Sequence, residues 1–545
     1  GRCDEPRDEL GRVTGSRIAA RTSSIAAREQ RLDALPISTR LGVANLVEGS
    51  VRRQGNRLRV SVSLIEGASG LAIWSETYER GPNELLNVQL DIAEQITSRM
   101  LPGAAQLTAE PATRDATANE LMLLARHYEQ QVRERQDFDR ETLLEAVRLY
   151  RRATEADPES ALAQSRLASA LLFLGDLEAA EAPIFKAMSL APKLSKVQNT
   201  LGEYYWARGR TKEAGAAWAY AIELNPNDAE AMSNLAWWRW TRIQEEGAME
   251  MYERALDVDR LNLERYADLG SFLALERTAD EAREVVRKVE ELFDGAAAYR
   301  VIAALYSYLG DVDKSIGWTL RAQKLEPSNP SHTEKLAEYY ADIGDFETAM
   351  ALDPEGIGIL FKMRRYDEMI EFAEFAMLDQ PNDMRIRSLL AIAHNAVGNY
   401  ESAIHVLSDT GLPDSVLNGW RTIEEMDAYH ALVNALYGLG EIEMARELAR
   451  WREDWGHTDS QDWWVNLRSA CDHLILDNEN HARNLLKKAQ QSLHLAWDPI
   501  LRDSPCFRPV TDEPVYQATV RYFDERRVML RERLPSTLAQ FGVSL

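Results

Sequence analysis

The chain has 545 residues, too many for a single hydrophobic core, so several domains or a repeat array are expected. Apolar residues make up 45% and charged residues 28%, proportions that exclude a chain disordered throughout. The net charge of −24 is uneven: residues 1–101 carry 14 Arg, no Lys and 13 acidic residues, whereas the other 444 residues carry −25. Because acidic surfaces repel phosphate backbones, we expect no nucleic acid to bind this chain.

The first hundred residues alternate apolar and polar side chains as β-strands do. Leu58, Val60, Val62 and Leu64 alternate with Arg and Ser, which predicts a half-buried strand. Turn-forming residues separate three such runs, predicting strands over 43–53, 58–64 and 71–78, followed by a helix over 84–100. We therefore predict a small α+β domain with an antiparallel sheet over 1–101. The Ala-, Thr- and Pro-rich residues 102–117 are the predicted linker.

The next part of the chain repeats itself. Pro158, Pro192 and Pro226 are each 34 residues apart in similar settings (EADP, SLAP and ELNP), and this period is typical of tetratricopeptide (TPR) repeats. Small residues such as Gly202 let two antiparallel helices approach closely, and a glycine such as Gly209 suits the end of the first helix. The pattern predicts a mainly α fold: a TPR α-solenoid preceded by the small α+β domain.

The repeats diverge after residue 228. We count about ten helical hairpins over residues 118–492, and a break near 353–356 divides them into arrays 118–354 and 355–492. The remaining segment, 493–545, contains a charged amphipathic helix over 515–534. We predict that this helix caps the last apolar repeat face.

Beyond the repeats, the chain resembles a second known family. Three runs, RIAARTSS (17–24), LGVANLVEGSVRRQGNRLRVSVSLIEGASG (41–70) and IWSETYER (73–80), resemble the TolB-like (FlgO-like) N-terminal domain that precedes TPR arrays in bacterial signalling proteins. The tail LRERLPSTLAQFGV (530–543) is similar to the ends of these proteins. The family's first strand, expected before Asp8, is missing, so we interpret the chain as truncated at its N-terminus.

The resemblance implies a regulatory or sensor role. In that family the TolB-like and TPR parts usually follow an output module, most often a class III adenylate/guanylate cyclase domain or a winged-helix DNA-binding domain. The preferred hypothesis is a protein–protein interaction scaffold from a bacterial signalling protein. The alternative is the non-catalytic C-terminal half of such a cyclase, or of a winged-helix transcription regulator.

The TPR register also predicts a binding groove. Positions 2, 5, 9 and 12 of each first helix line the concave face, where a protein or peptide partner is expected. In this chain they are Lys196, Asn199, Glu203, Trp206, Glu230, Ser233, Trp237 and Trp240. Buried aromatic residues often anchor binding. The alternative is that Trp237, Trp238 and Trp240 only fill space between repeats beside an irregular turn.

No pattern in the sequence indicates catalysis or a bound cofactor. There is no glycine-rich phosphate loop, and Cys471, His473 and His481, the nearest approach to a metal site, include two residues on different faces of a predicted helix. We therefore expect a non-enzyme without metal or cofactor.

The three cysteines are far apart and form no CxxC pair, so we expect them to be unpaired. Unpaired cysteines favour a reducing compartment and a cytoplasmic protein, with the periplasmic side of a membrane-anchored sensor as the alternative. No run of residues is apolar enough for a membrane helix. The oligomeric state is left open, a homo-oligomer included.

Overall fold

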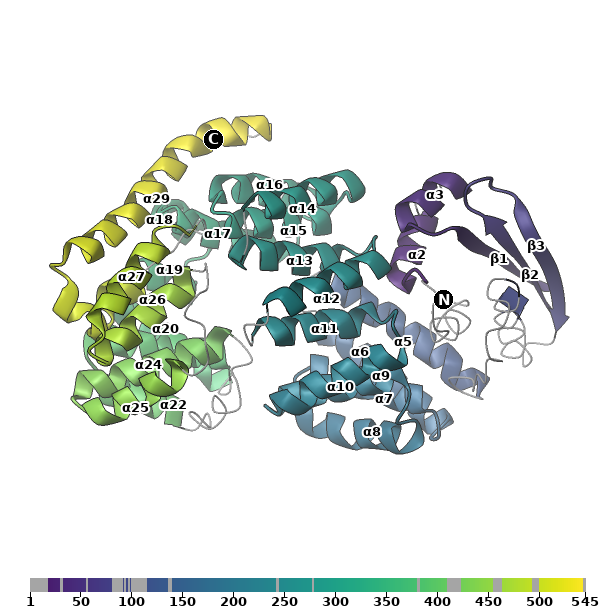
Figure 1. Cartoon of the computed structure of the whole chain (residues 1–545), viewed down its shortest axis with the longest axis horizontal. Coiled ribbons are helices and arrows are strands. Elements are labelled where there is room, and N and C mark those ends of the chain that lie inside the picture. Colours follow the sequence, from purple (N-terminus) through teal and green to yellow (C-terminus); the bar gives the residue numbers. More distant parts are fainter. Residues whose placement is uncertain are drawn as a thin grey trace. The chain divides into compact units, whose positions relative to one another are not determined.

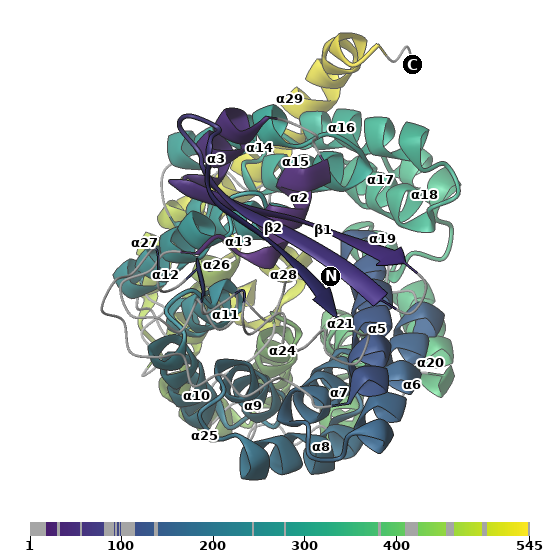
Figure 2. The same cartoon turned by 90° about the vertical axis from the view of Figure 1, so that its right-hand side faces the viewer.

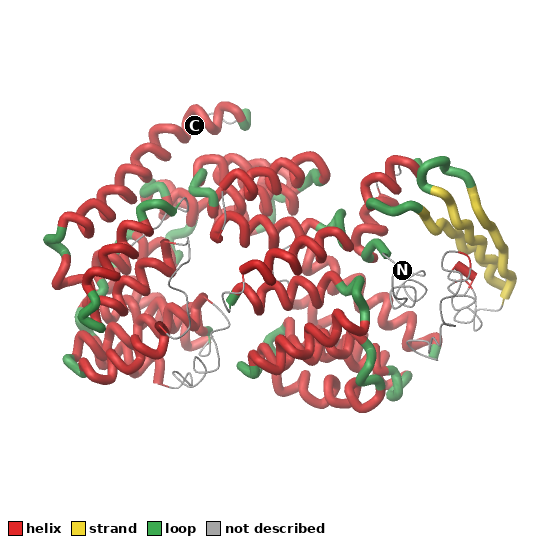
Figure 3. Tube along the Cα trace, viewed as in Figure 1, coloured by secondary structure: helices red, strands yellow, loops and turns green. Residues whose placement is uncertain are grey.

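The computed structural model describes residues 18–29, 33–54, 57–80, 92, 95–96, 99, 115–135, 140–241, 245–276, 279–379, 383–408, 423–453, 463–492 and 499–542. These residues are mostly helical, with one three-stranded sheet near the N-terminus (Figures 1 and 3). The chain divides into two compact units, Gly1–Trp240 with Glu246–Arg265, and Thr241–Glu245 with Tyr266–Leu545.

The N-terminal part of the first unit is the predicted α+β domain. Its elements are α2 (Arg21–Glu29), α3 (Ala34–Leu41), β1 (Asn45–Gln54), β2 (Arg57–Glu66) and β3 (Ala72–Arg80). The strands are antiparallel with β2 in the middle (Figure 2), so the three predicted strands are confirmed. Helices α2 and α3 were not predicted. Most of the helix expected over 84–100 and of the linker expected over 102–117 lies outside the described residues.

The sheet has one buried and one polar face. Val60, Val62 and Tyr78 form a cluster with Ile92 and Ile96. The opposite face carries hydroxyl pairs between neighbouring strands, Ser61–Thr77 at 3.1 Å and Ser63–Ser75 at 2.7 Å. This is the alternation expected of a half-buried antiparallel sheet.

Helix α2 is attached to the repeat array through a buried aspartate. Asp259 Oδ1 accepts hydrogen bonds from the backbone N–H of Ser23 at 3.1 Å and from its hydroxyl at 2.6 Å. The Ser23 hydroxyl in turn accepts a bond from Leu261 N at 2.8 Å. We call these contacts the Asp259 junction. They tie the α+β domain to residues more than 230 positions away in the sequence.

Eleven consecutive helix pairs follow among the described residues, one more than the approximate count expected. They are α5–α6 (Ala116–Arg135, Arg140–Ala156), α7–α8 (Ala161–Phe173, Leu177–Leu190), α9–α10 (Ser195–Ala207, Thr211–Leu224), α11–α12 (Ala229–Trp240, Glu245–Val258), α13–α14 (Leu263–Glu276, Ala279–Leu292), α15–α16 (Ala296–Tyr308, Val312–Leu325), α17–α18 (Pro330–Asp342, Phe346–Leu352), α19–α20 (Ile357–Lys362, Tyr366–Asp379), α21–α22 (Met384–Val397, Tyr400–Ser408), α24–α25 (Ile423–Leu439, Ile442–Glu453) and α26–α27 (Trp463–Ile475, Glu479–Ala489).

Within a pair, small residues bring the helices together as predicted. A side chain at Gly202 would place its Cβ 2.4 Å from Trp218 Nε1, so only glycine lets α9 approach α10 this closely. Gly209, in the turn between them, has a φ of +75°, a conformation that glycine adopts without strain. The break expected near 353–356 is a turn between the short helices α18 and α19, and it lies inside the second unit.

The C-terminal segment comprises α28 (Pro499–Asp503), the 3-10 helix η3 (Pro505–Val510) and α29 (Pro514–Gln540). The predicted amphipathic helix is confirmed, but it is longer than expected. Cys471 on α26 and Cys506 on η3 form a disulfide with their Cα atoms 5.5 Å apart. The expectation that all three cysteines are unpaired is therefore wrong. The two residues are 35 positions apart in different elements, a separation that carries no pairing signal.

Candidate functional site

The predicted groove residues lie on two first helices, α9 and α11, of neighbouring repeats. Lys196, Asn199, Glu203 and Trp206 come from α9, and Glu230, Ser233, Trp237 and Trp240 from α11. Side-chain contacts join several of them. Lys196 Nζ lies 2.5 Å from Glu230 Oε2, and Asn199 Nδ2 donates to Glu203 Oε1 at 3.0 Å.

These bonds extend across the adjacent repeats. Ser169 on α7 donates to Glu203 Oε2 at 3.0 Å, and Asn234 on α11 donates to Asn199 Oδ1 at 3.0 Å. We call Ser169, Glu203, Asn199 and Asn234 the polar row. It crosses three successive first helices, and Asn199 is fully buried. Ser169 and Asn199 are buried, so the row mainly joins the three helices, and only the half-buried Glu203 and Asn234 leave polar surface beside it.

Two charged side chains close to the polar row, Asp228 and Arg265, have side-chain partners within the protein. Burial raises the pKa of Asp228, whereas nearby Lys196 and the hydroxyl of Ser195, which donates to Asp228 Oδ2 at 2.6 Å, oppose that rise. Arg265, only 9% exposed, donates to the hydroxyl of Ser233. Ser233 is therefore a buried contact between helices rather than a residue open to a partner.

The tryptophans divide into two roles. Trp237 and Trp240 are half-buried and pack edge to face, with ring centroids 5.1 Å apart. Trp206, also half-buried, lies against Trp218 at 5.8 Å. Trp238 instead packs between repeats: its Nε1 donates to Thr211 O at 2.6 Å, and a Cβ at Gly215 would lie 2.4 Å from its ring. The alternative prediction, that a tryptophan fills space between repeats, therefore holds for Trp238. Residues 242–244 of the irregular turn lie outside the described part of the chain.

In the second unit, the C-terminal segment of the chain packs against first helices. Helix α28 contacts α21, and η3 contacts α24 and α26, which are the first helices of their pairs. The backbone of this segment is held at two points. Asn434 Oδ1 accepts from Cys506 N at 3.4 Å, and the hydroxyl of Tyr516 donates to Leu501 O at 2.9 Å. Sequence reasoning placed residues 493–545 only as a cap and missed this arrangement.

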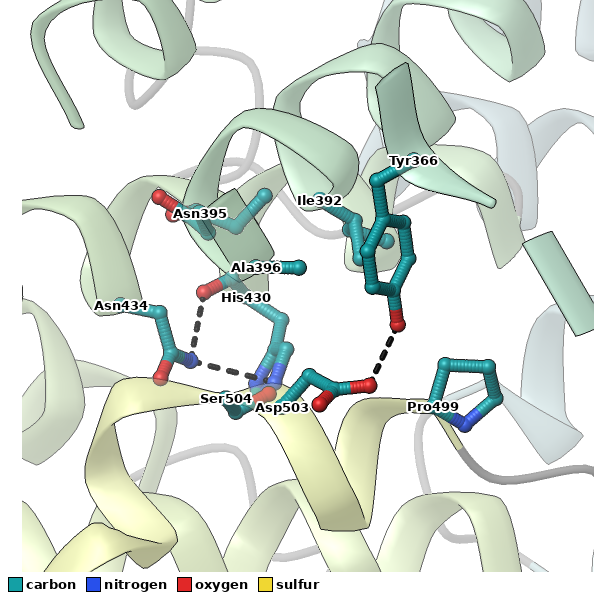
Figure 4. A pocket seen from close by; sticks show the side chains of 10 residues that line it. Tyr366, Ile392, Asn395, Ala396, His430, Asn434, Pro499, Asp503 and Ser504 are labelled. Atoms are coloured by element: carbon teal, nitrogen blue, oxygen red, sulfur yellow. Dashed lines mark hydrogen bonds between the residues drawn. The ribbon is translucent and has the colours of Figure 1, made fainter. Parts of the chain in front are cut away.

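A small pocket remains where α28 meets α21 and α24 (Figure 4). Its polar wall includes Asp503, which accepts a hydrogen bond from the hydroxyl of Tyr366 at 2.5 Å and an ion pair from Arg364. Burial raises the pKa of Tyr366, and the hydrogen bond to Asp503 adds to that rise. Asn395 Oδ1 is buried without a protein partner, so the pocket suits one bound water. Its residues come from four elements, and no sequence motif indicates it.

The residues considered as a metal site do not form one. Cys471 is in the disulfide, and the rings of His473 and His481 lie tilted against each other with centroids 4.0 Å apart. Across the described ranges, no three His, Cys, Asp or Glu side chains are placed to share an ion.

Comparisons with known proteins identify the repeats. A family profile described as tetratricopeptide repeat matches residues 138–193, and a second matches residues 197–219 and 426–451. The chain contains tetratricopeptide repeats. The first profile ends one residue after Pro192, and the second begins within α9, the helix that carries half of the predicted groove residues.

Two curated relatives match parts of the chain. A putative adenylate cyclase from Rhizobium meliloti is 33% identical over 162 residues, which is 29% of this chain and 27% of the relative. The BBSome complex member BBS4 from Bos taurus is 24% identical over 317 residues, 55% of this chain and 58% of the relative. The chain thus spans between a quarter and three fifths of the length of these relatives.

Two solved structures align with parts of the chain at low identity. Yeast Tom70 aligns over 78% of this chain and 98% of its own, at 14% identity and a TM-score of 0.32. PilF from Pseudomonas aeruginosa aligns over 41% and 97%, at 21% identity and a TM-score of 0.29. The fold assignment rests on the helix pairs and the family profiles. None of the described helices has an apolar stretch long enough to cross a bilayer.

Proposed function

We propose that the chain is a protein-interaction scaffold that receives a protein or peptide on the concave face of α7, α9 and α11. The observation that carries this proposal is the polar row beside the half-buried Trp206, Trp237 and Trp240. Aromatic side chains that a partner can bury dominate the binding energy of many interfaces, and polar groups beside them help to set orientation. In the second unit, by contrast, residues of the C-terminal segment already lie against the first helices.

The scaffold is tested by affinity capture with the whole chain as bait. Trp237→Ala should lose a specifically retained protein. Tyr220→Ala, which removes an exposed aromatic residue from the second helix α10, serves as the matched control and should keep it. Thermal unfolding of both variants shows whether each is folded. If Trp237→Ala retains the partner at unchanged stability, the groove assignment is wrong.

We further propose that this scaffold is the regulatory portion of a bacterial signalling protein, and is not itself an enzyme. The support is the match to a putative adenylate cyclase together with the resemblance to a TolB-like domain. The cyclase and winged-helix alternatives differ in what precedes residue 1. Sequencing the gene upstream distinguishes them, because a cyclase domain carries paired metal-binding aspartates and a winged helix does not. Cyclase activity from this chain alone would contradict the non-enzyme proposal.

The disulfide bears on the compartment. Structural disulfides persist mainly in oxidising environments, so Cys471–Cys506 favours the periplasmic alternative over the cytoplasm for the C-terminal repeats. The test is to block free thiols in intact cells, isolate the protein, and count the cysteines that react only after reduction. Two such cysteines support the proposal. Three thiols that react before reduction in denaturant would exclude it.

A further inference from the structure

Helix α29 joins two parts of the second unit that are far apart in sequence (Figure 1). Near its start, Tyr516 and Phe523 belong to the apolar cluster of α24 to α27. Its distal half belongs to a different cluster, that of α15 to α18. The helix therefore does more than cap the last repeat, because its final three turns contact α16, where Arg533 meets Asp313 from 220 residues earlier in the chain.

The distal half presents a row of leucines to this second cluster. Leu530, Leu534 and Leu538 follow one another at four-residue spacing, and each is at most 5% exposed. They pack with Val312 and Ile316 of α16, among other residues of the same cluster. Such a row laid into an apolar face is how amphipathic helices are recognised by helix-binding proteins.

A charged contact sets the register of this helix. Arg533 Nε donates to Asp313 Oδ2 at 2.7 Å, and its Nη2 donates to Asp311 Oδ1 at 2.9 Å. The hydroxyl of Thr537 also donates to Asp313 Oδ2, at 2.5 Å. Asp313 is fully buried. A buried carboxylate without a partner is strongly unfavourable, so this face requires a basic residue at one point of any helix that covers it.

The end of the helix fits a shaped site. The ring of Phe541 packs edge to face on Trp318 with centroids 5.5 Å apart, and Arg321 stacks over both rings at 4.8 and 4.9 Å. A Cβ at Gly317 would lie 2.5 Å from the Phe541 ring, so the absence of a side chain at Gly317 makes room for the ring. The contacts thus specify an aromatic residue three positions after the last leucine.

The distal half is held by these contacts more than by its own helix propensity. Pro535 lies inside α29 and cannot donate a backbone hydrogen bond, which costs about 3 kcal/mol in an isolated helix. The opposite side of this segment, including Met529 and Ala539, is exposed. A competing helix that offers the same contacts without an internal proline would therefore have an advantage over α29.

We propose that the face of α16 and α17 is a recognition site for a basic amphipathic helix, and that the distal half of α29 is its autoinhibitory occupant. The partner is a helix with leucines at positions i, i+4 and i+8, an arginine at i+3 and an aromatic residue at i+11. The inference rests on the proposed scaffold function but uses a different surface from the concave face of α7, α9 and α11. Loss of partner capture by Trp237→Ala therefore neither supports nor weakens it.

The test uses the full chain and a fluorescein-labelled synthetic peptide of residues 524–542, followed by fluorescence anisotropy. The released variant, Leu534→Asp with Leu538→Asp, places charge in the apolar row. The matched control, Met529→Asp with Ala539→Asp, adds the same charge on the exposed side of the same helix. The released variant should bind the peptide at least tenfold more tightly than the wild type or the control. The same peptide with Arg533→Glu should bind it at least tenfold more weakly.

Hydrogen exchange provides the second measurement. In the released variant, amides of residues 530–541 and α16 should exchange faster than in the wild type, and added peptide should restore protection in α16. A folded released variant that binds no better than the wild type, or that binds the Arg533→Glu peptide equally well, would overturn the proposal. If the released variant does not fold, Arg533→Glu in the full chain takes its place. This variant should bind the unmodified peptide of residues 524–542 more tightly than the wild type does. Equal binding would overturn the proposal.

Discussion

Gly202 allows a direct test of the packing that builds the candidate groove. It lies on α9, where an added Cβ would be 2.4, 2.6 and 2.8 Å from three atoms of the Trp218 indole. Real Cβ atoms essentially never approach this closely, so the indole must move. Trp218 is only 3% exposed, and its Nε1 donates to Asn199 O at 3.2 Å, so movement disturbs both the core and a groove residue.

The change in stability caused by Gly202→Ala is the sum of two costs and one gain. Overpacking a filled core costs about 1–3 kcal/mol, and weakening the indole hydrogen bond costs about 1 kcal/mol. Alanine recovers up to about 1 kcal/mol, because it is a better helix former than glycine. We expect Gly202→Ala to destabilise its repeat by about 1–3 kcal/mol. Gly358→Ala on α19, where no heavy atom lies within 4 Å of the added Cβ, should instead stabilise by up to about 1 kcal/mol.

Native-state hydrogen exchange is the appropriate assay, because a repeat array need not unfold in one step. The free energy of local opening is compared between each variant and the wild type, in α9–α10 for Gly202→Ala and in α19–α20 for Gly358→Ala. The expected result is opposite signs for one chemical change. Equal or greater protection of α9–α10 in Gly202→Ala would refute the argument, because it would show that the indole relaxes without cost.

Three further changes have defined outcomes. Asp259→Ala should remove about 2–3 kcal/mol of local stability and speed hydrogen exchange in α2. The control Asp257→Ala breaks the more exposed ion pair with Arg260 and should leave exchange in α2 unchanged. Equal exchange in the two variants would count against the Asp259 junction. Cys506→Ser should lower the free energy of unfolding of the second unit by about 3–4 kcal/mol, from the 35-residue separation of the paired cysteines, and a reductant should then have no added effect. Burial lowers the pKa of His394, so its stabilising contribution is present above its unfolded pKa of about 6.5 and is lost as pH falls through the lower folded value. Denaturant unfolding of His394→Gln should accordingly be less acid-sensitive than the wild type below pH about 6.5, with exposed His405→Gln as the control; identical profiles would contradict the assignment.

The sequence was sufficient to predict the repeats and the helices that carry the candidate groove. Proline at a 34-residue spacing sets the register of the helix pairs. Once that register is known, positions on one face of a first helix follow from helical geometry. Lys196, Asn199 and Glu203 therefore come from the expected helix, and two of them contact each other. That these residues bind a partner stays a prediction, because geometry alone does not identify a ligand.

Contacts between distant residues were the part that the sequence did not predict. The amphipathic pattern of residues 515–534 shows that the helix buries one side, but the pattern has no information about which surface covers it. Arg533 contacts Asp313, which is 220 residues away in the sequence, and Cys471 pairs with Cys506, which is 35 residues away. No repeating sequence pattern indicates either pairing. The short α18 and α19 illustrate the other case, because local turn residues ended α18 where the sequence indicated.

The two units are built from the same type of helix pair but differ in what lies against their first helices. In the first unit the first helices present the polar row and half-buried tryptophans. In the second unit the residues after the last helix pair turn back, so that 499–510 lie against the first helices and α29 against α16. Because α29 is tethered to the surface that it covers, it is present there at a high effective concentration. An external partner must compete with that concentration to bind. Variants that loosen α29 should therefore alter binding at α16 without altering capture at Trp237, and this separation distinguishes two independent interaction surfaces from a single continuous one.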